Sequence, residues 1–124
     1  MRSNAKLLRL FKKYNRKYFG NSLKTPVIYF SDLRKRRVPL LGETDKTRII
    51  VYRVSADRKW TEISRRPRIV IDNDLKSPSW GAVLRMTLLH EIVHLKLPCG
   101  VGHGPRFHKE MRRLARIGAF EGSW

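Results

Sequence analysis

The chain has almost no cysteine: Cys99 is the only one among its 124 residues. A single cysteine cannot form an intramolecular disulfide, and it cannot supply the several thiolates of a Cys-rich zinc ribbon. A disulfide-stabilised fold and a zinc ribbon are therefore both excluded, and the cysteine content fits a reducing compartment.

Acidic residues are also scarce. Asp and Glu total 10 against 28 Lys and Arg, which gives a formal net charge of +18. The basic residues are spread along the chain, so disordered low-complexity sequence explains them poorly. The excess favours a polyanionic partner, and we expect nucleic acid rather than a membrane or an acidic protein. A basic surface that serves only solubility is the alternative.

Long hydrophobic runs are missing as well. The chain has no run of 18 apolar residues, and its first residues, from Met1 to Lys6, lack the apolar core of a signal peptide. We therefore expect a soluble intracellular protein, which would be cytoplasmic or nucleoid-associated in a prokaryote or virus and nuclear in a eukaryote. The length suits a single domain over residues 1–124, and no internal repeat is evident.

Hydrophobic periodicity predicts an α+β fold. An amphipathic helix should begin after Ser3, a plausible N-cap, and end at Gly20. Residues 42–45 have the chemistry of a turn, and residues 55–66 are expected to form a polar connection. Short β-rich runs predict three to four strands in a small, mainly antiparallel sheet, at residues 27–30, 38–41, 48–54 and 68–72.

Two more helices are expected in the second half of the chain. The first should be capped by Ser77 or Ser79 and end at Pro98. The second should begin at Pro105 and close at Gly118. Between them, a glycine-rich segment allows the chain to reverse direction sharply.

The first of these helices carries an H-E-x-x-H motif, with His90, Glu91 and His94. Residues four apart lie on one helix face, so His90 and His94 can direct two imidazole nitrogens at one cation. Glu91 is then placed to exchange protons with a water beside a catalytic zinc ion. The alternative is a helix with two surface histidines, but apolar neighbours favour a site in a core-packed cleft: Leu88, Leu89, Ile92, Val93 and Leu95.

A catalytic zinc needs a third protein ligand, and His103 is the favoured candidate. It follows the glycine-rich reversal, so it can fold back onto the preceding helix. His108, Glu110 and Cys99 remain as alternatives. Arg106 is expected to be a surface cation rather than an oxyanion donor.

The spacing excludes two families of three-histidine zinc enzymes. A metzincin needs glycine at position 97 and histidine at position 100, where this chain has Leu97 and Gly100. The bacterial endoribonucleases that mature ribosomal RNA also need a histidine at position 100, where this chain has Gly100.

The chain resembles the SprT-like (Spartan-type) zinc metalloprotease domain. The resemblance lies in the H-E-x-x-H motif followed by the Gly102-His103-Gly104-Pro105-Arg106-Phe107 segment, and more weakly in residues 7–31. It implies a zincin-like fold, zinc held by His90, His94 and His103, and Glu91 as the catalytic residue. Its implied activity is the cleavage of proteins bound or crosslinked to DNA, as in DNA–protein crosslink repair.

Two features differ from the family pattern. The interval between His94 and His103 is short, and no Cys-rich ribbon follows the motif in these residues. The basic surface of the domain would then have to supply the contact with DNA. Two other functions remain open: a non-catalytic zinc-containing module that binds nucleic acid, and a metal-dependent nuclease.

Overall fold

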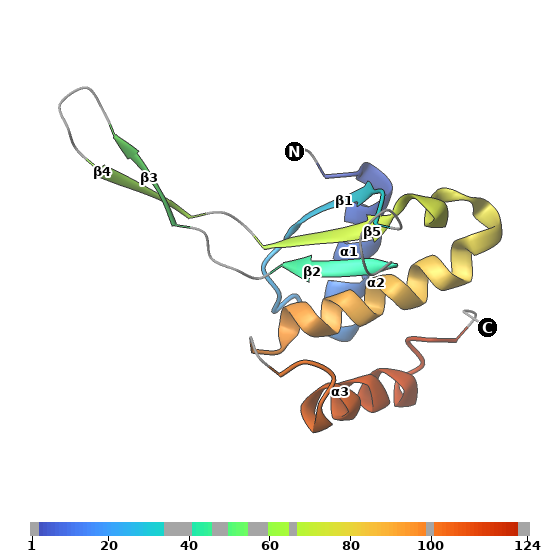
Figure 1. Cartoon of the computed structure of the whole chain (residues 1–124). Coiled ribbons are helices and arrows are strands. Elements are labelled where there is room, and N and C mark those ends of the chain that lie inside the picture. The colour runs from blue at the N-terminus through green and yellow to red at the C-terminus, as the bar shows by residue number, and fades with distance from the viewer. Residues whose placement is uncertain are drawn as a thin grey trace.

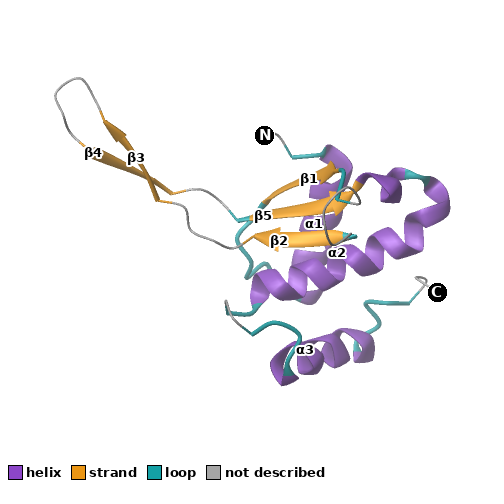
Figure 2. Cartoon of the chain, in the orientation of Figure 1, coloured by secondary structure: helices purple, strands orange, loops and turns teal. Residues whose placement is uncertain are grey.

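The computed structural model describes residues 3–33, 41–45, 50–54, 60–64, 67–98 and 101–121. Together these residues form an α+β arrangement, as predicted (Figures 1 and 2). Its elements are α1 (Ala5–Tyr18), β1 (Val27–Ser31), β2 (Gly42–Asp45), β3 (Ile50–Val54), β4 (Trp60–Ser64), β5 (Arg68–Asp72), the short 3-10 helices η1 (Asn73–Lys76) and η2 (Pro78–Trp80), α2 (Gly81–Lys96) and α3 (Pro105–Arg116).

Helix α1 begins one residue later than the predicted cap implied. Asn4, not Ser3, is the N-cap, and its side-chain oxygen accepts a hydrogen bond from the Leu7 N–H at 3.1 Å. The Ser3 hydroxyl oxygen instead accepts from the Ile28 N–H at 3.0 Å, which ties the start of the chain to β1. Leu7 and Phe11 are fully buried, so this helix is fixed by core packing on one face.

The main sheet has the strand order β1-β5-β2. Strand β1 is parallel to β5, whereas β2 is antiparallel to it. The main sheet is therefore mixed, with one parallel and one antiparallel pairing, whereas a mainly antiparallel sheet was predicted. The parallel pair arises because the chain passes through three other strands between β1 and β5, instead of returning directly by a hairpin.

Two local predictions in this region are also wrong. The expected turn at residues 42–45 is β2, which pairs with β5 in the register Thr44↔Ile69. Part of the expected polar connection is β4, which pairs with β3 in a separate two-stranded sheet, from Ile50↔Ser64 to Val54↔Trp60. Figure 1 shows this hairpin reaching away from the helices. The predicted strand at residues 38–41 falls almost wholly outside the described residues.

Helix α2 is the central element of the fold. It contacts β2, β5, α1 and α3, and it carries a set of fully or almost fully buried apolar side chains: Leu84, Leu88, Leu89, Ile92 and Val93. The expected cap Ser77 is instead the N-cap of η2, and Ser79 lies within η2, so α2 itself begins only at Gly81, with Trp80 as its N-cap. Helix α3 begins at Pro105 as predicted. No helix in the described ranges is both long and apolar enough to cross a bilayer.

Candidate metal centre

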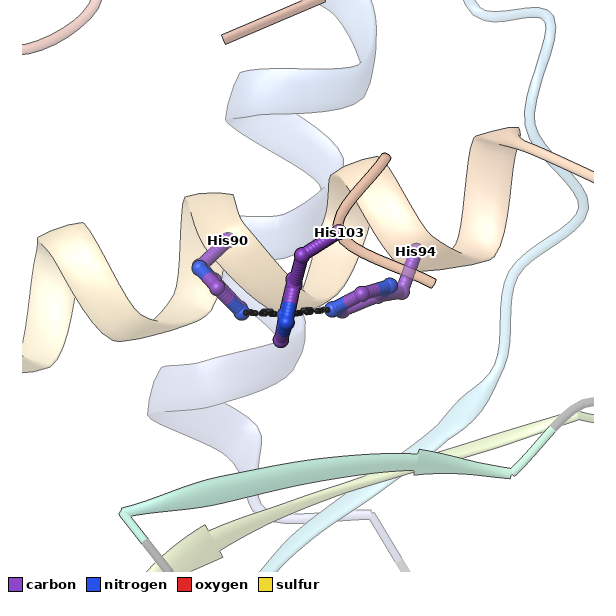
Figure 3. A group of neighbouring side chains, drawn as sticks. All are labelled: His90, His94 and His103. Atoms are coloured by element: carbon purple, nitrogen blue, oxygen red, sulfur yellow. Dashed lines mark hydrogen bonds between the residues drawn. The ribbon is translucent and has the colours of Figure 1, made fainter. Parts of the chain in front are cut away.

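Three histidine side chains converge at one point beside α2 (Figure 3). His90 and His94 lie one turn apart on α2, and His103 comes from the loop that precedes α3. The three Nε2 atoms are 3.2 Å (His90 to His94), 3.1 Å (His90 to His103) and 2.9 Å (His94 to His103) apart. These are the three histidines predicted from the H-E-x-x-H motif and the glycine-rich segment that follows it. They lie close enough to bind one metal ion.

The loop before α3 explains how His103 reaches α2. Gly102 has a φ of +58°, a backbone conformation that glycine adopts without steric cost. The Gly104 N–H then donates to the Val101 carbonyl oxygen at 3.3 Å, which closes a tight turn around His103. Pro105 directly starts α3, where its missing N–H costs no helical hydrogen bond.

Two of the three alternative third ligands, His108 and Glu110, do not join this cluster. His108 is exposed, and its ring lies edge-on to Phe107 at a centroid distance of 5.9 Å. Glu110 is buried and is engaged by two cations, the Lys96 ammonium at 2.9 Å and the Arg113 Nε at 2.8 Å. Cys99 lies outside the described residues.

The electrostatics of the triad favour a bound cation. A ring nitrogen holds either a proton or a lone pair in its plane, so three mutually close nitrogens cannot all be satisfied by hydrogen bonds to one another. Burial, followed by the neighbouring His94 and His103, lowers the pKa of His90 to about 4. A neutral imidazole offers a lone pair, and a shared cation would satisfy all three lone pairs at once.

Phe107 packs against all three imidazole rings. Its side chain is 4% exposed, and its ring centroid lies 4.9 Å from that of His90, 4.7 Å from that of His94 and 4.8 Å from that of His103. The ring is stacked on His94 and edge-on to the other two. The sequence did not indicate that this residue would pack against the ligands.

Glu91 lies beside the triad and is nearly inaccessible to solvent, with 5% exposure. Burial outweighs the opposing effect of a hydrogen bond from Thr44 and, together with the charge of Glu43, raises the pKa of Glu91 to about 7. The Thr44 hydroxyl lies 2.8 Å from Glu91 Oε1 and 3.0 Å from the Glu91 carbonyl oxygen. Thr44 therefore holds the carboxylate in a fixed position.

Gly42 lets β2 approach α2 closely. A Cβ atom at this position would lie 2.9 Å from Thr87 Cγ2, 3.0 Å from Glu91 Cγ and 3.1 Å from Glu91 Oε2. No larger residue fits there unless Glu91 moves. The sequence did not reveal Gly42 and Thr44 as site residues, because their local chemistry indicated a turn and their role depends on pairing with β5.

An apolar cleft of about 530 Å³ opens next to Glu91 and His90. Thr87 and Gly42 lie with them along its polar edge, and the rest of its lining is apolar: Leu41, Val83, Met86, Met111 and Phe120. Leu41 and Met86 are 40% and 36% exposed, so the cleft has an accessible apolar mouth. A molecule in this cleft would lie directly against the carboxylate.

A charged cluster joins the three helices. It consists of Lys96, Glu110 and Arg113, and we call it the clamp. Glu110 on α3 pairs with Lys96 at the end of α2 and with Arg113 on its own helix. Arg113 also donates to the Tyr18 carbonyl oxygen of α1 at 3.0 Å. Both cations lie over the Phe19 ring, at 5.7 Å for Lys96 and 5.3 Å for Arg113. The clamp thus fixes α3, and with it the His103 loop, against α2.

Comparison of the chain with protein-family models, with curated proteins and with solved structures finds no match.

Proposed function

We propose that this protein is a zinc-dependent metallopeptidase of the SprT-like type, with His90, His94 and His103 as zinc ligands and Glu91 as the catalytic acid–base. The observation that carries the proposal is the convergence of three Nε2 atoms next to a buried carboxylate. A structural zinc site usually has four protein ligands, whereas a catalytic site has three and leaves one position open. His103 is exposed, which leaves the triad accessible from solvent.

The spacing of the histidines supports zinc as the metal. Zinc bound by imidazole nitrogens at about 2.0–2.1 Å in tetrahedral geometry holds those nitrogens about 3.3 Å apart. The observed separations of 2.9 to 3.2 Å are close to this value. Three neutral nitrogen ligands also suit zinc better than magnesium or calcium, which prefer oxygen ligands.

When bound, zinc would act as a Lewis acid that polarises a carbonyl group and makes a nearby water more acidic. Glu91 is the residue that handles the proton: its carboxylate accepts a proton from the attacking water and delivers it to the leaving nitrogen of the peptide bond. Thr44 keeps Oε1 of Glu91 in place during this transfer, through the 2.8 Å contact of its hydroxyl.

The substrate would be an extended polypeptide. Among the described strands, β2 pairs only with β5, and it runs along the side of α2 that carries Glu91. A peptide that pairs with the outer edge of β2 would pass the triad, as in β-strand addition. The neighbouring apolar cleft would accept an apolar side chain of that peptide.

Proteins bound or crosslinked to DNA are the proposed substrate class. The net charge of +18 supports this choice, because a phosphate backbone would relieve the mutual repulsion of the basic side chains. Nucleic acid would then bring the protein substrate and the site together.

The test compares wild type with Glu91→Gln, each with its zinc content measured by mass spectrometry. Both are incubated with a basic protein on DNA and with DNA alone. We expect wild type to cut the protein, and we expect the variant to keep its zinc and lose activity by about 100- to 10,000-fold, the contribution typical of a general acid–base.

Two outcomes would contradict the proposal. If zinc-loaded wild type leaves the DNA-bound protein intact, the protease assignment is wrong and a non-catalytic nucleic-acid-binding module is favoured. If wild type cuts DNA and Glu91→Gln does not, the protein is a metal-dependent nuclease.

A further inference from the structure

Helix α1 presents a continuous basic face to solvent, on the side opposite its buried apolar residues. This α1 basic face consists of six residues, all of them exposed: Lys6, Arg9, Lys12, Lys13, Arg16 and Lys17. At 3.6 residues per turn they occupy an arc of about 140°, and at 1.5 Å per residue they extend over about 17 Å. The helix contains no acidic residue.

These cations have no carboxylate partner in the described part of the chain. The ion pairs there join other residues, and Lys17 has only a cation–π contact with the Tyr18 ring at 5.4 Å. Elsewhere the protein does pair its cations: Arg68 contacts Asp45, and the clamp places two cations around Glu110. The α1 basic face is therefore an unneutralised field of positive charge.

A polar hollow of about 410 Å³ adjoins this face. It brings together the side chains of Lys12 and Lys24 with the hydroxyls of Ser3 and Thr25. The Ser3 oxygen already accepts the Ile28 N–H, so its own O–H is directed elsewhere and can donate. Two ammonium groups and two hydroxyls around a hollow are the donors that a phosphate group requires.

We propose that the α1 basic face, together with this hollow, binds the phosphate backbone of a nucleic acid without regard to its sequence. A helix that binds a membrane surface must bury its apolar side in lipid, but Leu7 and Phe11 on that side are 0% exposed in the protein core. Only the charged side remains to make contact. Successive phosphates of one DNA strand rise by about 3.4 Å, so the face spans about five of them.

The position of α1 leaves the metal centre open. Figure 3 shows α1 crossing behind α2, whereas His103 and its loop lie in front. Nucleic acid on α1 would therefore not cover the histidines, and a protein held on the same nucleic acid would reach the cleft at a raised effective concentration. The binding of nucleic acid to α1 does not depend on the proposed function. Only the consequence that the bound nucleic acid brings a protein substrate to the cleft rests on it.

The test uses two triple variants that remove the same charge. Arg9→Gln, Lys12→Gln and Arg16→Gln remove three of the six charges of the α1 basic face, and Lys109→Gln, Arg112→Gln and Arg116→Gln remove three exposed cations of α3. Binding of a fluorescent DNA duplex of random sequence is measured by anisotropy over a range of salt concentrations. At about 0.1 M salt we expect the α1 variant to bind on the order of 100-fold more weakly, with a salt slope smaller by about 3.

Circular dichroism melting of both variants distinguishes a loss of binding from a loss of folding. Equal losses in the two variants would overturn the inference, because binding would then follow total charge and not the α1 basic face. Tighter α1-dependent binding to phosphatidylserine vesicles than to the duplex would overturn it as well. Hydrolysis of a peptide without nucleic acid, measured on wild type, tests the proposed function separately.

Discussion

Strand β2 and helix α3 support the candidate site from two sides, and they do so in different ways. β2 acts through close approach: Gly42 leaves no room for a methyl group beside Glu91, and the Thr44 hydroxyl contacts the Glu91 carboxylate. α3 acts through packing and charge: Phe107 packs against the imidazole rings, and Glu110 belongs to the clamp. One side fixes the carboxylate and the other fixes the third histidine, so the base and the metal ligands should be separable by mutation.

The largest effect is expected on the α3 side, from His103→Ala. Loss of a partner that only orients a metal ligand weakens metal binding by about 10- to 100-fold, so loss of the ligand itself should cost more, on the order of 1,000-fold. The affinity for zinc can be measured by competition with a chromogenic chelator.

The matched control is His108→Ala, which removes an exposed histidine from the same helix region. It should bind zinc as wild type does, because its ring contacts only the edge of Phe107 among the described rings. If His108→Ala loses zinc while His103→Ala keeps it, the ligand assignment is wrong and the division between the two sides fails.

On the β2 side, Gly42→Ala should reduce activity without releasing the metal. The new Cβ would lie 3.0 Å from Glu91 Cγ and 2.9 Å from Thr87 Cγ2, so the Glu91 side chain has to move. A displacement of about 1 Å at a reacting group can cost on the order of 100-fold in rate, and we expect a loss of about 10- to 100-fold in kcat/KM. Peptide hydrolysis and zinc content are measured on the same sample.

Gly81→Ala provides the control for this substitution. Gly81 lies at the start of α2, has helical φ and ψ, and would place a Cβ no closer than 3.4 Å to its neighbours. Alanine there should leave activity unchanged and stabilise the helix slightly. Zinc loss in Gly42→Ala would show that β2 positions the ligands as well as the base.

The same contrast explains what the sequence predicted about the site. The pairing of His90 with His94 depends on helical spacing, which is local, and His103 follows from a glycine-rich reversal only a few residues away. Neither requires knowledge of distant contacts. The triad was therefore predictable, and so were the helices that carry it, apart from the start of α2 and the cap of α1.

The β2 side was not predictable in this way. Gly42 and Asp45 favour turns in isolation, and they become a strand because β5 pairs with them from more than 20 residues away. The contact of Thr44 with Glu91 joins residues 47 positions apart. The parallel pairing of β1 with β5 is equally non-local. Long-range pairing thus decided both the mixed sheet and the residues that hold the carboxylate.

The smallest effect is expected in the clamp, from Glu110→Gln. Burial alone would raise the pKa of Glu110, but hydrogen bonds and charges from Arg113 and Lys96 outweigh it and lower the pKa below its usual value. The ionised carboxylate therefore stabilises the fold above its unfolded-state pKa, and this stability is lost as the pH falls through the lower folded-state pKa. At neutral pH the variant should lose about 1–2 kcal/mol in the free energy of unfolding, and the difference from wild type should shrink in acid.

Urea unfolding at several pH values measures this difference, with Glu121→Gln as the control. Glu121 is exposed and lies outside the clamp, so its replacement changes the net charge by the same amount and leaves the clamp intact. A loss confined to Glu110→Gln assigns the stability to the ion pairs that link α3 with α2 and α1. Equal losses in both variants would instead assign it to the general repulsion in a protein of charge +18, and the clamp would then not be what holds the His103 loop in place.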